Sequence, residues 1–141
     1  MMRPFFSFLA LLLLTASVHA SPLIWAGLFL GENRPTGPQA PPSLTSRLQE
    51  VFGFRNYKLI KGVNIDLRSP WDHGVVARKD FFLRIKAVPP VPGGPDRLEY
   101  EIYKDGFIVA RGLYVVTSDT PLFINGPDFH RGRLIFVVEQ R

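Results

Sequence analysis

The chain has 141 residues, of which 46% are hydrophobic and 21% are charged, with a formal net charge of +5 and no cysteine. This length suits one ordinary domain, and the hydrophobic fraction is too high for a disordered chain. The absence of cysteine excludes a disulfide scaffold, a thiolate nucleophile and a zinc-thiolate or iron–sulfur site.

Residues 1–20 have the pattern of a secretory signal peptide. Arg3 supplies the positive start, Phe5 to Leu14 is an apolar run, and the small residue Ala20 marks a cleavage site. We therefore expect an exported protein, periplasmic or extracellular, whose mature part is a single domain over residues 21–141.

The alternative is a segment retained as a membrane anchor, because Pro22 to Leu30 is apolar again. His19, Ser21 and Pro22 interrupt the two apolar runs, and the first run alone is too short to span a hydrocarbon core of ~30 Å. We expect cleavage and no stable membrane span afterwards, but the sequence leaves both alternatives open.

The mature chain begins with three distinct segments. Leu23 to Leu30 is a short apolar run, typical of a strand buried on both faces. Residues 31–42 contain four prolines and two glycines, which predicts a loop. Residues 43–53 have helical spacing of apolar side chains, and Gly53 stands where a helix commonly ends.

The predicted helix should rest on a sheet through Leu44, Leu48 and Phe52, because so short a helix needs tertiary contacts to persist. Its start has two candidate caps. Ser46 with Gln49 forms a capping-box pattern, and Ser43 is the alternative.

From Phe54 onward the hydrophobic period changes to two, which indicates strands. Strands are predicted at 57–61, 63–67, 81–88, 97–104, 107–116, 121–125 and 134–138, with a turn at 125–128. The run at 134–138 has no alternation and predicts a central strand buried on both faces. The chain is therefore predicted to be mainly β: a single β-sandwich or small open barrel of about seven or eight short antiparallel strands, with one short helix near the N-terminus.

Asp105-Gly106 is the two-residue signal for a hairpin with a type I′ turn. A regular register places Val109 and Leu113 on the apolar face and puts Arg111 there as well. The alternative is a bulge near Gly112, which turns Arg111 toward Glu99 and Glu101 on the other face.

Catalytic signals are weak. His73 lies near Asp72 and His130 near Asp128, so a two-histidine, two-aspartate metal site would need their loops to meet. Solvated loop histidines are the better interpretation, and no nucleophile elbow is present. We expect no catalytic residue, no metal, no cofactor and no enzyme activity; a hydrolase using His73 or His130 is a distant alternative.

Trp71 stands among polar loop residues, where a sugar ring could stack on it. The competing interpretation is that Trp71 folds back over the end of the sandwich. A ligand site at this position would consist of Trp71, Asp72, His73 and His130.

Arg84 and Lys86 alternate on one predicted strand and could join Arg78 and Lys79 in a basic patch. For an exported protein the matching partner is an anionic envelope polymer or an acidic protein face, not nucleic acid. A merely solvated face is the competing interpretation.

The order of segments resembles a loose group of small, uncharacterised secreted bacterial β-sandwich proteins. The resemblance rests on three motifs, which are Leu48-x-x-Val51-Phe52-x-Phe54-x-x-Tyr57-x-Leu59-Ile60, Pro121-Leu122-Phe123-Ile124-x-Gly126-Pro127 and Gly132-Arg133-Leu134-Ile135. It implies that the first apolar strand belongs to the sandwich, and it transfers no activity and no site.

These observations predict an exported, non-catalytic β-sandwich module that binds a partner protein or a cell-envelope component. The alternative is a carbohydrate- or glycan-binding module that uses Trp71. The sequence leaves open the identity of the ligand, the oligomeric state and the distance between His73 and His130.

Overall fold

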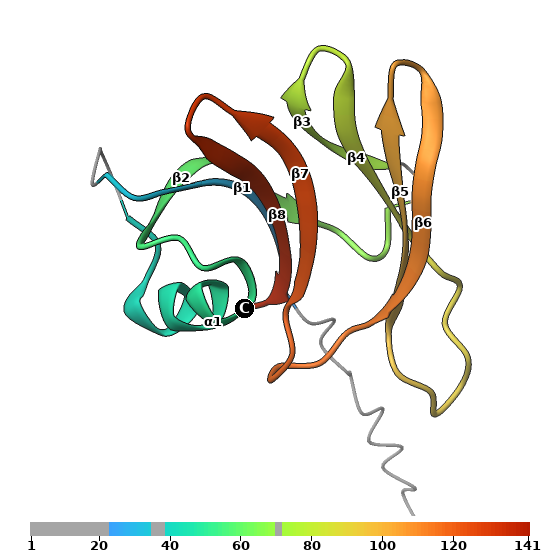
Figure 1. Cartoon of the computed structure of the whole chain (residues 1–141). Helices are drawn as coiled ribbons and strands as arrows, with labels where there is room; N and C mark the ends of the chain where they lie inside the picture. The colour runs from blue at the N-terminus through green and yellow to red at the C-terminus, as the bar shows by residue number, and fades with distance from the viewer. Residues whose placement is uncertain (1–22, 35–38, 70–71) are drawn as a thin grey trace, which may run out of the picture.

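Eight strands and one helix make up the part of the chain that the computed structural model describes, residues 23–34, 39–69 and 72–141 (Figure 1). The predicted cleavage site after Ala20 and the predicted sugar platform Trp71 lie outside these residues. The elements are β1 (Ile24–Glu32), α1 (Pro42–Phe52), β2 (Asn56–Ile65), β3 (His73–Arg78), β4 (Phe81–Ala87), β5 (Arg97–Lys104), β6 (Phe107–Val115), β7 (Leu122–Phe129) and β8 (Gly132–Gln140).

The strands form two four-stranded antiparallel sheets. Sheet A has the order β2-β1-β8-β7, and sheet B has the order β3-β4-β5-β6. Figure 1 shows sheet A between α1 on one side and sheet B on the other. The prediction of a small, mainly β sandwich with one short helix near the N-terminus is confirmed.

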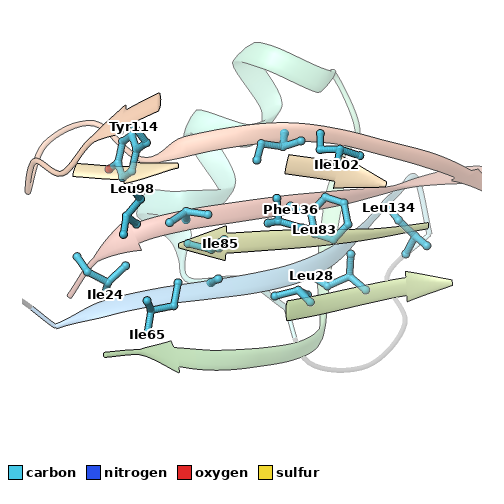
Figure 2. Close-up of a cluster of buried hydrophobic side chains, with 14 of the residues drawn as sticks. Ile24, Leu28, Ile65, Leu83, Ile85, Leu98, Ile102, Tyr114, Leu134 and Phe136 are labelled. Atoms are coloured by element: carbon cyan, nitrogen blue, oxygen red, sulfur yellow. The ribbon is translucent and has the colours of Figure 1, made fainter. Parts of the chain in front are cut away.

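The two central strands of sheet A, β1 and β8, are buried on both faces because they are apolar at nearly every position. Their even-numbered side chains face sheet B and form the larger core (Figure 2), whereas the odd-numbered ones pack beneath α1. The side chains toward sheet B are Ile24, Ala26, Leu28, Leu30, Leu134, Phe136 and Val138, and those toward the helix are Trp25, Phe29, Ile135 and Val137. The expectation that both apolar runs are strands buried on two faces is confirmed.

Helix α1 begins with a proline and ends with a glycine. Pro41 and Pro42 start the helix without a side-chain cap; proline suits this place because its missing N–H would have no helical partner. The capping-box prediction is therefore wrong, and the Gln49 side chain instead donates to the carbonyl of Arg55 at 2.9 Å. Gly53 has φ +79° and its N–H donates to the Gln49 carbonyl at 3.0 Å, as predicted for the end of the helix.

The helix packs on sheet A through Leu44 and Leu48, as predicted. Phe52 is half-buried and contacts the ring of Phe123 edge-on, with centroids 6.2 Å apart. The helix thus covers the face of the sheet that sheet B leaves open.

Two buried tyrosines anchor loops to the sheets. The Tyr57 hydroxyl donates to the Leu48 carbonyl at 2.9 Å and accepts the Phe54 N–H at 3.1 Å. The Tyr114 hydroxyl donates to the Thr120 carbonyl at 2.6 Å. Burial raises the pKa of both phenols because it disfavours the phenolate, and a backbone hydrogen bond offsets part of each shift.

Trp25 lies flat across two facing glycines, Gly27 on β1 and Gly62 on β2. A Cβ at either position would overlap the indole ring, so only glycine leaves room for it. The guanidinium of Arg141 covers the ring at 3.7 Å from its centroid. Gly62 lies inside β2, which is one continuous strand, so the prediction of two separate strands at 57–61 and 63–67 is wrong.

The turn predicted at 125–128 is also wrong, because β7 continues through it. The register of β7 with β8 shifts between Asn125 and Asp128, which makes Gly126 and Pro127 a bulge. A Cβ on Gly126 would overlap the Leu134 carbonyl, so this close approach requires glycine. The chain reverses instead after Phe129.

We expect Gly27→Ala to lower the free energy of unfolding by about 1–3 kcal/mol, because the new methyl group displaces the buried Trp25 ring. Gly74→Ala in β3 is the matched control: its Cβ would meet only a carbonyl oxygen at 3.8 Å. This control should be neutral or slightly stabilising. Urea unfolding of both variants measures the difference, and equal stability of the two would contradict the packing role of Gly27.

We expect the free energy of unfolding to fall as the pH rises above about 10. In this range the unfolded chain loses phenol protons while folded Tyr57 and Tyr114, with raised pKa values, keep theirs. The two tyrosines therefore stabilise the fold fully at pH values below their unfolded-state pKa. This stabilisation is lost as the pH rises through their folded-state pKa. Denaturant unfolding between pH 9 and 11.5 should show a smaller loss in the double variant Tyr57→Phe/Tyr114→Phe; Tyr103→Phe, which leaves both buried phenols in place, should keep the full loss.

Candidate functional site

The outer face of sheet B is the surface on which the candidate residues gather. Alternation in β4 turns Phe81, Leu83 and Ile85 into the core and leaves Phe82, Arg84 and Lys86 outside. In β5 the outward side chains are Glu99, Glu101 and Tyr103, which the register places opposite Lys86, Arg84 and Phe82 respectively. Because α1, the one helix among the described residues, packs on sheet A, no helix of this part of the chain covers the face.

An aromatic and aliphatic row crosses this face. The register aligns Val76, Phe82, Tyr103 and Ile108, one residue from each strand of the sheet. The Phe82 and Tyr103 rings are parallel, with centroids 4.6 Å apart. Apolar side chains thus extend from one edge of sheet B to the other.

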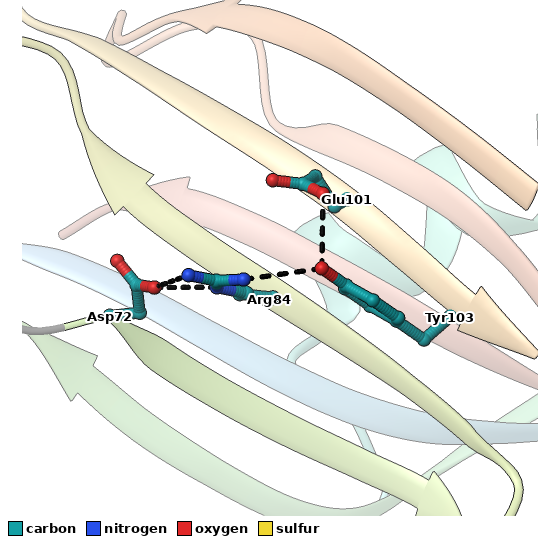
Figure 3. A network of polar contacts seen from close by, with 4 residues as sticks. All are labelled: Asp72, Arg84, Glu101 and Tyr103. Carbon is teal, nitrogen blue, oxygen red and sulfur yellow. Dashed lines mark hydrogen bonds and ion pairs between the residues drawn. The ribbon is translucent and has the colours of Figure 1, made fainter. Parts of the chain in front are cut away.

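A polar network runs beside that row (Figure 3). Two guanidinium nitrogens of Arg84, Nε and Nη2, contact one carboxylate oxygen of Asp72. Nη1 donates to the Tyr103 hydroxyl at 3.2 Å, and this hydroxyl donates to Glu101 at 3.1 Å. The hydrogen bond to Tyr103 and then the contacts with Asp72 raise the pKa of Arg84, so the guanidinium is held as a fixed cation.

The β5–β6 hairpin has the predicted type I′ turn, with φ +52° at Asp105 and +81° at Gly106. Its register shifts between Ile102 and Tyr103, so that the bulge falls at Val109 rather than near Gly112. Of the two predicted alternatives, the bulged one is therefore closer to the structure, although its position is displaced along β6.

Because of the bulge, the residues of β6 after Val109 face the opposite side of the sheet from the one that the regular register predicts. Arg111 now stands opposite Glu101, and Leu113 stands opposite Glu99 on the outer face. Leu113 was expected to face the core under the regular register, and this expectation is wrong. A shallow hollow of about 290 Å³ lies here, lined by Glu99, Tyr100, Glu101, Arg111, Gly112 and Leu113.

Exposed apolar side chains are concentrated on β6, and the sequence interpretation missed them as surface residues. Their exposed fractions are Phe107 74%, Ile108 41%, Val109 54%, Leu113 53% and Val115 44%. The sequence of β6 is apolar at neighbouring positions, so apolar side chains stand on both faces of the strand. Only one face of sheet B packs into the core, which leaves the others exposed.

The histidine and aspartate candidates do not converge. Asp72 pairs with Arg84, and Asp128 pairs with Arg133 at 3.1 Å. His73 is a half-buried strand residue rather than a solvated loop residue, and its Nε2 has no hydrogen-bond partner among the described residues. His130 lies exposed in the turn between β7 and β8, with φ +52°.

The two histidines lie toward opposite ends of β3. His73 begins this six-residue strand and Arg78 ends it. Arg78 and Asp128 of the β7–β8 hairpin line one hollow of about 480 Å³, and His130 follows two residues after Asp128 in the chain. Six strand residues extend roughly 17–20 Å. Within the described ranges no group of three histidine, aspartate or glutamate side chains could hold a metal ion.

The four predicted basic residues also divide into two groups. Arg84 and Lys86 share the outer face of β4, opposite Glu101 and Glu99. Arg78 pairs with Asp80 at 3.3 Å at the β3–β4 turn. Lys79 is exposed in that turn. Because Arg84 and Lys86 lie opposite two glutamates, the outer face of sheet B carries charges of both signs and is not a basic patch.

Comparison with known proteins gives no match to a family model, a curated protein or a solved structure. The resemblance to small secreted bacterial proteins therefore stays a prediction. Among the described residues no helix is long and apolar enough to cross a membrane.

We expect Arg84→Ala to leave the urea midpoint nearly unchanged, because the guanidinium is solvated and an exposed ion pair contributes little to folding. Leu83→Ala, one residue earlier and fully buried, should cost about 2–5 kcal/mol. A large loss of stability in Arg84→Ala would show that the polar network is needed for the fold.

Proposed function

We propose that this chain is an exported, non-catalytic β-sandwich module that binds a partner protein through the outer face of sheet B beside β6. The observation that carries the proposal is the group of exposed apolar side chains on this single strand, of which the register places Ile108, Leu113 and Val115 on the outer face. Contiguous exposed apolar surface with polar residues around it is typical of protein interaction sites. The pattern of residues 1–20 supports export.

The charges of the same face support a protein partner over an anionic polymer. Arg84 and Lys86 alternate with Glu99 and Glu101 across the strands, so a uniformly negative chain would meet two carboxylates as well as two cations. Mixed charges beside apolar rows favour a partner surface with its own defined pattern. The glycan-binding alternative depends on Trp71 and stays a prediction.

Site-specific photo-crosslinking tests this proposal in the cells that produce the protein. A benzophenone amino acid at Leu113 or Val115 should give one discrete protein adduct after irradiation. The matched control is Ile60 on β2, which is 44% exposed and lies in the other sheet. The same adduct from Ile60, or no adduct from either β6 position, would contradict binding through this face.

A further inference from the structure

Three of the four edge strands carry a feature that hinders pairing with another strand. In β7 the bulge contains Pro127, which has no N–H to donate. In β2 the edge presents Lys58 and Lys61, and Gln39 forms a β-bridge to Lys58. Strand β3 has six residues and a broken register. Such features are the usual protection of natural sheet edges.

Strand β6 is the exception. It has nine residues, no proline and one charged residue, Arg111, and its register with β5 is unbroken from Ala110 to Val115. Among the described residues β5 is the only strand paired with it. The backbone N–H and C=O groups of every second residue therefore point away from the sheet, as in any one-sided strand.

The rows of side chains indicate what would pair there. The register places Arg84, Glu101 and Arg111 side by side on the outer face, so charges alternate in sign toward the open edge and end in a cation. Opposite charges on neighbouring strands attract, and like charges repel. The next position in this row is therefore suited to a carboxylate.

The two following rows end in apolar side chains. Leu113 and Val115 lie two and four residues beyond Arg111, both exposed, in the regular part of the strand. We propose that β6 accepts an extended segment of a partner protein as a fifth strand of sheet B. This segment carries a carboxylate opposite Arg111 and apolar side chains two and four positions away.

This inference rests on the proposed function and specifies its partner. A second copy of the chain fits less well, because Arg111 is the only charged residue of β6. Two β6 edges placed side by side would put no carboxylate beside either Arg111. Strand addition supplies affinity through the backbone and specificity through alternate side chains, so one acidic position can select the partner.

Capped, fluorescein-labelled peptides test the inference with the purified chain. The probes contain Val-Thr-Ile-Thr-Glu for antiparallel addition and Glu-Thr-Ile-Thr-Val for parallel addition, each matched by a peptide with Lys in place of Glu. Fluorescence anisotropy should show binding of a Glu peptide, weakened roughly 3- to 10-fold by the change to Lys.

The variant Arg111→Gln should abolish this preference, because it removes the cation without reversing its charge. Lys86→Gln is the matched control: it removes a cation from the same face two strands away, and the preference for Glu should remain. Circular dichroism checks that both variants stay folded. N-methylation of alternate peptide amides should block binding in one frame and not in the other, because only every second N–H faces β6.

Two results would overturn strand addition: no binding of either Glu peptide, or equal effects of N-methylation in both frames. Equal binding of Glu and Lys peptides would overturn the selection of a carboxylate by Arg111. Sedimentation showing a dimer of the purified chain, together with no binding of either Glu peptide, would assign the edge to a second copy instead. If crosslinks at Leu113 persist while the peptides fail, protein binding stands and only strand addition is wrong. If no crosslink forms, the proposed function itself is wrong.

Discussion

The antiparallel pairing of β1 with β8 is the contact on which the rest of the structure depends. It joins the first and last strands of the described chain, and nearly every side chain in both strands is buried. A fully buried large apolar side chain contributes about 1.5–3 kcal/mol relative to exposure, so this pair accounts for much of the hydrophobic stabilisation. Its two faces hold the other layers: sheet B packs on one and α1 on the other.

This arrangement makes the two sheets unequal. In the central strands of sheet A, the side opposite the larger core packs against α1 and Ala40. In the described part of the chain no helix packs on the outer face of sheet B, and Arg84, Lys86 and Glu99 are exposed there. The outer face of sheet B is therefore the candidate binding face, because the single helix of the described chain packs on sheet A instead. A rigid core behind an exposed edge also keeps the ordering cost of binding low.

The excess of basic residues does not produce a basic surface on this face. Four arginines pair with carboxylates close in sequence or space, and these are Arg78, Arg84, Arg133 and Arg141. On sheet B the remaining charges alternate by strand. Arg111 ends one of these rows at the open edge, beside which the proposed fifth strand would place its carboxylate. In the proposed strand addition, electrostatics of this kind contributes mainly to specificity, while the backbone hydrogen bonds supply the affinity.

Local pattern by itself determined β1 and β8, the two central strands of sheet A, together with the Asp105-Gly106 turn and the glycine end of the helix. Each of these depends on the side chains or dihedral angles of a few neighbouring residues. The tertiary structure alone decided the bulge at Val109, the continuity of β2 under Trp25 and the separation of His73 from His130. A bulge changes which face a residue occupies without changing its neighbours in the chain, because strand register is set by the partner strand and the core. The outward position of Arg111 and Leu113, and with it the candidate site, follows from that long-range pairing.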